Sequence, residues 1–247
     1  MKLFRCIGAL LALLFCLGAA SAREVKLTAD TMQYDSASGY FTATENVKIV
    51  REGVTATAKK AEGNMNGGEV NLIGDVHIFG VWEDEKVDIK GQILTGYLQE
   101  PRGLSFKGTV QGVWGSKQVD AEDLSTRGDT FSVAKLRRFA DSAEGFSFSC
   151  NSIKGKLKDG EIVEFTAVGA FRFLSSQKRG TPTEIRGDRA VYSKARGSLV
   201  VNGNVSAVQD GRSLRSDSLV YFPVKNRIEA TGKPQLIFKI DEGSKKQ

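Results

Sequence analysis

Two stretches near the C-terminus of the chain repeat one another. Ile185–Tyr192 leads into Leu199–Val205, and Leu214–Tyr221 leads into Ile228–Pro234. Asp188 precedes Gly203 by 15 residues, Asp217 precedes Gly232 by 15, and the two units are offset by 29. A fixed period of this length is typical of stacked supersecondary units, each of which buries its apolar face against the next. The repeat therefore predicts an elongated molecule with a continuous inner face.

The unit is recognised by a kernel of glycine, a polar residue and a β-branched residue. Gly203-Asn-Val205 is the clearest copy, and about seven units are expected along the chain. The other copies are Gly74-Asp-Val76, Gly108-Thr-Val110, Glu45-Asn-Val47 and the degenerate Gly169-Ala-Phe171 and Gly232-Lys-Pro234. One interval is twice as long as the rest, which predicts a further, eroded kernel within 133–137.

Alternation of apolar and polar residues follows the kernels throughout the chain. In Glu161–Phe173, Val163, Phe165, Phe171 and Phe173 recur with a period of two. This period is typical of strands with one buried and one solvated face. The chain has 27 glycines and 4 prolines, so its turns are expected to use glycine and small polar residues, and its strands run without the interruption that proline would impose. The sequence predicts an all-β, elongated antiparallel stack of strand pairs.

The N-terminus has the features of an export signal. Lys2 and Arg5 precede an apolar run, and a small-x-small motif ends at Ala22. We therefore expect cleavage between Ala22 and Arg23, with domains at 1–22 (signal peptide), 23–240 (the β domain) and 241–247 (a disordered tail). An uncleaved membrane anchor and a lipoprotein modified at Cys16 are alternatives. The apolar run is short for a span, and bulky Phe15 disfavours lipidation.

Charge and composition argue against several classes of function. The formal net charge of +6 is dispersed along the chain, whereas nucleic-acid-binding proteins concentrate basic residues on one patch, so no nucleic-acid partner is expected. His77 is the sole histidine, and Cys150 is the sole cysteine after residue 22. These residues predict no catalytic triad, no metal site and no cofactor, and Cys150 is interpreted as a small strand residue.

A few polar and aromatic residues are candidates for chemical or binding sites. The recurrent Asp30, Asp188 and Asp217 suit either turns or a row of carboxylates in a glycan-active β-solenoid enzyme. The acidic segments 83–85 and 120–123 are interpreted as turns or solvated strand edges. Trp82 and Trp114 are interpreted as core or rim residues rather than as sugar-stacking platforms.

These motifs resemble the LptA/OstA family of periplasmic lipopolysaccharide-transport proteins. The resemblance lies in Ala29-Asp30 and Tyr34 followed by Glu45-Asn46-Val47, and it returns at Asp188 to Val205 and at Asp217 to Gly232. It covers roughly 26–240, and is weakest at 115–165. It implies a slightly open, V-shaped β-jellyroll that holds the acyl chains of lipopolysaccharide (lipid A), or of a related glycolipid, in an apolar groove. It also implies a periplasmic location, end-to-end oligomers, and contacts with other Lpt proteins of the inner and outer membranes.

The chain is longer than a typical member of that family, and its leader also fits the membrane anchor of the LptC-like sister proteins. An LptC-like adaptor of the export transporter therefore stays open as an alternative, as does an insertion within 115–180. The inward-facing residues predicted to line the groove are Val47, Ile49, Leu72, Val76, Ile78, Phe106, Val110, Phe131, Val133, Phe165, Phe171, Phe173, Leu199, Val201, Val205, Leu219, Tyr221 and Phe238. Plain core packing is the competing interpretation for each of them.

Overall fold

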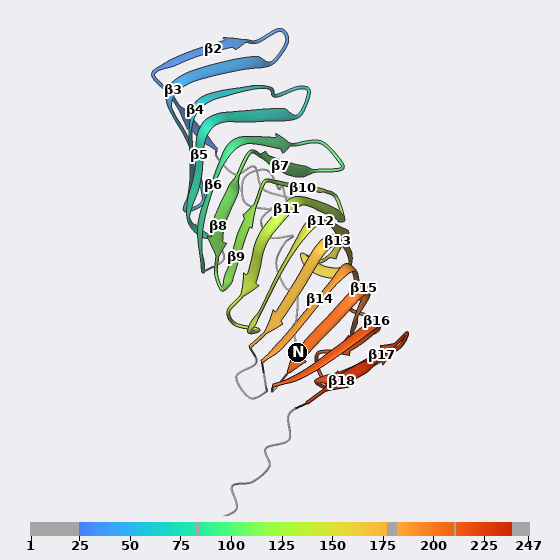
Figure 1. The fold of residues 1–247 in the computed structure, drawn as a ribbon. Helices are drawn as coiled ribbons and strands as arrows, with labels where there is room; N and C mark the ends of the chain where they lie inside the picture. Colours follow the sequence, from blue (N-terminus) through green and yellow to red (C-terminus); the bar gives the residue numbers. More distant parts are fainter. Residues whose placement is uncertain (1–24, 83, 177–181, 210, 239–247) are drawn as a thin grey trace, which may run out of the picture.

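The computed structural model describes residues 25–82, 84–176, 182–209 and 211–238. Within these ranges the chain is built from antiparallel strands (Figure 1). The strands are β1 (Lys26–Thr28), β2 (Thr31–Asp35), β3 (Tyr40–Arg51), β4 (Val54–Asn64), β5 (Glu69–Trp82), β6 (Glu85–Tyr97), β7 (Gly103–Lys107), β8 (Val110–Trp114), β9 (Lys117–Ala121), β10 (Asp123–Arg127), β11 (Thr130–Asp141), β12 (Phe146–Lys158), β13 (Glu161–Ser175), β14 (Thr183–Ser193), β15 (Ser198–Gln209), β16 (Arg212–Phe222), β17 (Arg227–Thr231) and β18 (Gln235–Ile237).

The strands form one hydrogen-bonded ladder that extends along the length of the molecule, from the N-terminal strands at one end to the C-terminal strands at the other (Figure 1). Each long strand pairs with the long strand before it and after it, as β12 does with β11 and β13. Short strands occur in pairs that share one long neighbour: β1 and β2 on β3, β7 and β8 on β6, β9 and β10 on β11, and β17 and β18 on β16. Each short pair therefore takes the place of one long strand.

The break between two short strands corresponds to a corner within each long strand. The ladder register shifts at these corners, for example between Asn202 and Val205 of β15 and between Ile73 and Val76 of β5. Such bulges bend a strand and increase its local twist. Each rung therefore has two halves. We call the half that contains β1, β8, β9 and β18 the first half-sheet, and the half that contains β2, β7, β10 and β17 the second half-sheet.

The predicted kernels are the corners. Each places backbone in the left-handed region, which glycine tolerates and asparagine or aspartate adopts more readily than other residues. The corner residues with positive φ are Glu45, Asn46, Gly74, Asp75, Gly108, Thr109, Lys135, Gly169, Ala170, Gly203, Asn204, Gly232 and Lys233. Lys135, at φ 45°, lies inside the 133–137 window where an eroded kernel was expected.

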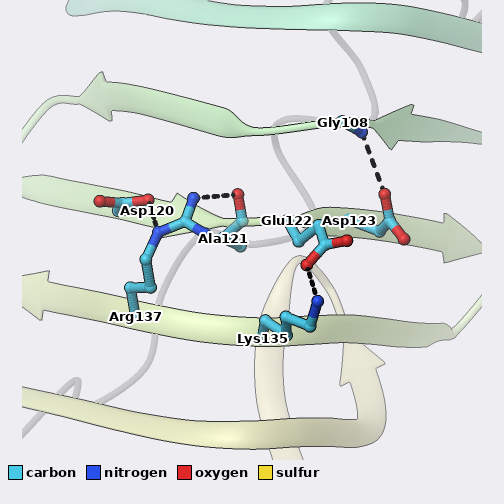
Figure 2. A network of polar contacts seen from close by, with 7 residues as sticks. All are labelled: Gly108, Asp120, Ala121, Glu122, Asp123, Lys135 and Arg137. Carbon is cyan, nitrogen blue, oxygen red and sulfur yellow. Dashed lines mark hydrogen bonds and ion pairs between the residues drawn. The ribbon is translucent and has the colours of Figure 1, made fainter.

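A polar network supports this eroded corner (Figure 2). The Lys135 ammonium lies 2.6 Å from a Glu122 carboxylate oxygen. The Arg137 guanidinium donates to Asp120 at 2.6 Å and to the carbonyl oxygen of Ala121 at 2.8 Å. These contacts tie β11 to the junction between β9 and β10, where the kernel lacks its glycine.

The corner at Gly108 also contacts the segment between β9 and β10 (Figure 2). The backbone N–H of Gly108 donates to Asp123 at 3.1 Å. The acidic segment 120–123 predicted as a turn or strand edge is therefore a corner, with its carboxylates facing adjacent rungs.

The two half-sheets face each other and enclose the core. Phe148 pairs with Phe139 and Phe173 in the first half-sheet, whereas Phe165 pairs with Tyr192 in the second. The Phe148 and Phe165 ring centroids are nevertheless 5.7 Å apart. This two-layered antiparallel arrangement confirms the predicted all-β fold.

The middle of the chain belongs to the same ladder. Residues 115–180 include β9 to β13, which pair in sequence with their neighbours. The described part of 115–180 is therefore continuous with the ladder and does not form a separate unit. The segment 1–22, with Ala22, and the tail 241–247 lie outside the described residues, so the cleavage before Arg23 and the domain bounds stay predictions. Among the residues described, no helix has the length and apolar character needed to cross a bilayer.

Candidate functional site

The space between the half-sheets is lined by the alternating apolar residues of every rung. All but one of the predicted groove residues are buried there. They are Val47, Ile49, Leu72, Val76, Ile78, Phe106, Val110, Phe131, Val133, Phe165, Phe171, Phe173, Leu199, Val201, Val205, Leu219 and Tyr221. Phe238 differs: it follows β18 at the end of the ladder and is 55% exposed. Alternation predicts which face a residue takes, but a face at the last rung has no further rung to cover it.

The alternating pattern also places residues on the inner face that were not predicted as groove residues. Leu94, Phe148, Ile153 and Ile185 are buried and join the same cluster. The alternation of apolar and serine residues in 146–150 indicates that Phe148 faces inward. Trp82 and Trp114 are buried as well, in agreement with their interpretation as core or rim residues.

The interior changes character along its length. Near the N-terminal end the buried positions of β3 and β4 include Ala43, Ala56, Ala58 and Ala61. From β11 onward, many of the buried positions carry aromatic rings. These are Phe139, Phe146, Phe148, Phe165, Phe171, Phe173, Tyr192 and Tyr221. The interior is thus richer in small side chains at the N-terminal end and richer in rings from β11 onward.

Aromatic and polar contacts close the C-terminal part of the interior. The rings of Phe173 in the first half-sheet and Tyr221 in the second have centroids 5.7 Å apart. The hydroxyl of Tyr221 is hydrogen-bonded to Ser175 and Thr183, while burial, the larger effect, raises its pKa. The side-chain amide of Gln209 donates to Thr183 at 2.9 Å. The two layers are therefore joined by hydrogen bonds as well as by rings.

An apolar cavity lies near the middle of the ladder. It holds about 600 Å³ of empty space, part of it open to solvent, and is walled by residues of β6, β8, β9, β10, β11 and β12. Of the predicted groove residues, Phe131 and Val133 line it. The interior is thus neither evenly filled nor evenly open.

Both ends of the ladder present strand edges. Among the described residues, β2 pairs in register with β3 and β17 pairs in register with β16, and neither is paired on its other side. Register places Met32 and Tyr34 opposite the buried Ala43 and Phe41, on the inner face. Yet Met32 and Tyr34 are 46% and 63% exposed. The apolar inner face therefore reaches the N-terminal end uncovered.

The polar residues considered for catalysis do not gather in this space. Asp30, Asp188 and Asp217 are exposed at corners. Asp30 and Asp188 each accept a hydrogen bond at 2.7 Å, from Asn46 and Asn204 respectively. The side chain of Asp217 lies against Gly232. They act as corner residues.

The remaining reactive groups are also separated from one another. His77 contacts Asp88 at 3.0 Å on the outer face of the first half-sheet, and burial raises the pKa of the Cys150 thiol to about 12. Asp84 lies in the turn between β5 and β6. Within the ranges that the structure describes, no group of histidine, cysteine, aspartate and glutamate side chains is arranged to hold a metal ion.

Comparison with known proteins gives one family match. Residues 17–80 match the family described as "Lipopolysaccharide-assembly, LptC-related". No curated protein matches the chain. Among solved structures the chain is similar to LptH, the LptA-homologous periplasmic component of the lipopolysaccharide-transport device of Pseudomonas aeruginosa. That likeness has a TM-score of 0.31 and 10% identity, and covers 88% of this chain and 96% of the other.

Proposed function

We propose that this chain, an Lpt-type protein whose residues 17–80 match the LptC-related family, is a periplasmic carrier in lipopolysaccharide transport. The acyl chains of lipid A, or of a related glycolipid, would lie between the half-sheets. The observation that supports this most strongly is the continuous apolar inner face, which runs through every rung and reaches the N-terminal end uncovered. Such a face suits hydrocarbon chains that are longer than a single side-chain pocket.

The proposed activity is shielding without bond making or breaking. Each methylene removed from water contributes about 0.8 kcal/mol, so a lipid with several acyl chains needs a long dry surface to leave one membrane for another. The inward valines, isoleucines and leucines provide that surface. Where Phe173 meets Tyr221, bound chains would displace rings and part the two layers.

Strand edges would carry the assembly. An exposed edge offers unpaired backbone N–H and C=O groups to another strand. β2 at one end and β17 at the other are such edges among the described residues. End-to-end pairing of copies, and pairing with Lpt proteins of the inner and outer membranes, would join the apolar faces into a bridge across the periplasm.

The family description supports a second candidate. An LptC-type adaptor anchored in the inner membrane would have the same fold but would keep its leader. Mass spectrometry of the exported protein separates the two: a chain that begins at Arg23 supports the soluble carrier, and an intact Met1 in the membrane fraction supports the adaptor. The corner positions of Asp30, Asp188 and Asp217 give no support to a glycan-active enzyme.

Extraction of co-purifying lipid tests the carrier function. The protein is purified from the periplasm without detergent, and bound lipid is identified by mass spectrometry. We expect lipid A species in amounts comparable to the protein. A lipid-free protein that also fails to take up added lipopolysaccharide would exclude the proposal.

A further inference from the structure

The outer face of the first half-sheet carries an ordered row of apolar side chains. One row of directly opposite residues crosses the ladder from β5 to β18, and every second residue in it is apolar. The apolar members, which we call the outer stripe, are Phe79, Val113, Ala140, Leu174, Val208 and Ile237. The solvent face of an antiparallel sheet is normally polar, and apolar residues scattered singly on it need no explanation. The outer stripe differs because its members share one row.

The outer stripe is exposed and evenly spaced. Phe79, Val113, Val208 and Ile237 are 38–55% exposed, and a polar residue of the intervening strand separates each member from the next. Neighbouring strands lie about 4.8 Å apart, so successive members are about 10 Å apart. Seven residues of an α-helix rise about 10.5 Å. The spacing therefore matches side chains seven residues apart on a helix that runs across the strands.

The middle of the outer stripe lies in a hollow. Every residue of the row from Val113 to Val208 lines one open cavity of about 980 Å³, and Arg138 lines it as well. The turn residues Ser116 and Ser142 are part of the same lining. An elongated partner could lie along such a hollow and contact the apolar row, whereas a flat surface would meet its rim first.

Four arginines lie beside the outer stripe. Arg138 and Arg172 each precede a stripe residue by two positions, and Arg186 and Arg215 each follow a polar residue of the row by two. Residues two apart on a strand share a face, so all four arginines face outward with the stripe. Between the corners and the turns of β11 to β16, the described residues of this face include one acidic side chain, Glu184.

Two of the arginines share that single carboxylate. Arg172 and Arg186 are directly opposite in register, an arrangement of like charges that destabilises a sheet. Glu184 accepts a hydrogen bond from the Nε of each, at 2.7 and 2.6 Å respectively. One negative charge therefore serves two guanidiniums, and both side chains remain about half exposed, at 48% and 58%.

The other two arginines form no ion pair among the described residues. Asp120 lies opposite Arg138 in register, but its carboxylate accepts a hydrogen bond from Arg137 at 2.6 Å. Arg215 lies opposite Ser206 and Gln235. A partner that covers the outer stripe would thus meet surplus positive charge along one side of it, and an acidic partner would be complementary.

We propose that the outer stripe and its arginines form a docking groove for an acidic amphipathic α-helix of another protein. Apolar side chains at intervals of seven would contact Val113, Ala140, Leu174 and Val208 in turn, and glutamates or aspartates on the adjacent face would pair with the arginines. The three intervals correspond to a helix of about 20 residues. The inference concerns the outer face, so it holds whether or not the interior carries lipid.

A synthetic helix tests the groove directly. A fluorescein-labelled peptide of about 20 residues carries leucine at every seventh position, glutamates along one flank and alanines elsewhere. Its anisotropy is followed as the full exported chain is added. We expect saturable binding that weakens as salt is added, and no binding by the same peptide with lysines in place of the glutamates. Absence of binding by the acidic peptide, or equal binding by both, would overturn the proposal.

Substitutions locate the bound peptide. Arg138→Glu and Val208→Asp, both at exposed positions, should keep the wild-type melting temperature and weaken binding at least tenfold. Lys154→Glu and Val168→Asp make the same changes on the outer face of the second half-sheet and should leave the affinity unchanged. Wild-type affinity in both Arg138→Glu and Val208→Asp would place the peptide elsewhere and contradict the assignment.

Two other occupants are distinguished by separate measurements. Sedimentation with phosphatidylglycerol vesicles tests an anionic membrane surface, and analytical ultracentrifugation tests a second copy of the chain. We expect neither vesicle binding nor self-association to change in Arg138→Glu and Val208→Asp. Vesicle binding that both variants abolish, or dimers that both dissociate, would replace the helix as the occupant. Lipid-free protein that binds the peptide would remove the carrier function and keep the groove.

Discussion

The side-chain amide of Asn204 donates a hydrogen bond to Asp188 at 2.7 Å across a corner of the ladder. Asn46 makes the same bond to Asp30, also at 2.7 Å, near the other end of the molecule. The same hydrogen bond from asparagine to aspartate therefore stabilises the corner in two widely separated rungs. The repeated Asp and Asn are explained by backbone geometry, because the kernel residue adopts a left-handed conformation that its neighbour's carboxylate stabilises.

Gly203→Ala should destabilise the fold more than an equivalent change at an open turn. Gly203 has φ +77°, and an added Cβ would lie 2.5 Å from Asp188 Oδ2. We expect a loss of about 1–3 kcal/mol in the free energy of unfolding. Gly197→Ala is the control, because Gly197 has φ +61° but nothing within 4 Å. Equal losses in urea denaturation would show that the Asp188 contact is unimportant.

Lys135→Gly should stabilise the eroded corner. Lys135 has φ 45°, a conformation that costs an L-residue roughly 1–2 kcal/mol and glycine much less. Its ion pair with Glu122 is solvent-exposed and is worth less than about 1 kcal/mol. Lys135→Ala, which loses the pair and keeps the strain, should be less stable than the wild type. The prediction fails if glycine and alanine lower the midpoint of denaturation equally.

Phe171→Ala should be strongly destabilising in the lipid-free protein. Phe171 is 1% exposed inside the aromatic end of the interior, where removing a ring typically costs about 3–5 kcal/mol. Val168→Ala, at a 45% exposed position of the same strand, should cost less than about 1 kcal/mol. A small effect at Phe171 would mean that this end of the interior is loosely packed.

The Cys150 thiol should be unreactive in the folded protein. Burial raises its pKa from 9.0 to about 12, so the folded state keeps the proton that the unfolded state releases. Stability from this group is therefore full below about pH 9 and declines toward pH 12 by up to about 1.4 kcal/mol per pH unit. Iodoacetamide at pH 8 should label the unfolded chain and spare the native one, and Cys150→Ala should remove this part of the alkaline slope.

The sequence predicts those features of the fold that recur in every rung, namely the kernels and the alternation of apolar and polar residues. The kernels Gly74-Asp75 and Gly203-Asn204 were expected to end one strand and begin the next, whereas they lie at corners inside the long strands β5 and β15. Their spacing nevertheless located the eroded corner at Lys135. Alternation of apolar and polar residues predicted which side chains face inward, because successive side chains of a strand point to opposite faces. Local pattern says nothing, however, about which rings of the two layers meet, as Phe148 and Phe165 do.

Two features of the site, the cavity and the exposure of Phe238, could not be predicted from the sequence pattern. The cavity is walled by residues of β6, β8, β9, β10, β11 and β12, so its position depends on how several strands pack together and not on the pattern within any one of them. Phe238 continues the alternation, but it is exposed because the ladder has no covering rung there.

The central claim is that the inner face holds lipid, and site-specific photocrosslinking in living cells tests it most directly. A photoreactive residue is placed at inward Val205 or Phe171, with outward Val208 and Val168 as controls on the same strands. We predict lipopolysaccharide adducts from the two inward positions and none from the controls. Adducts confined to the outward positions, in protein that reaches the periplasm folded, would contradict the account.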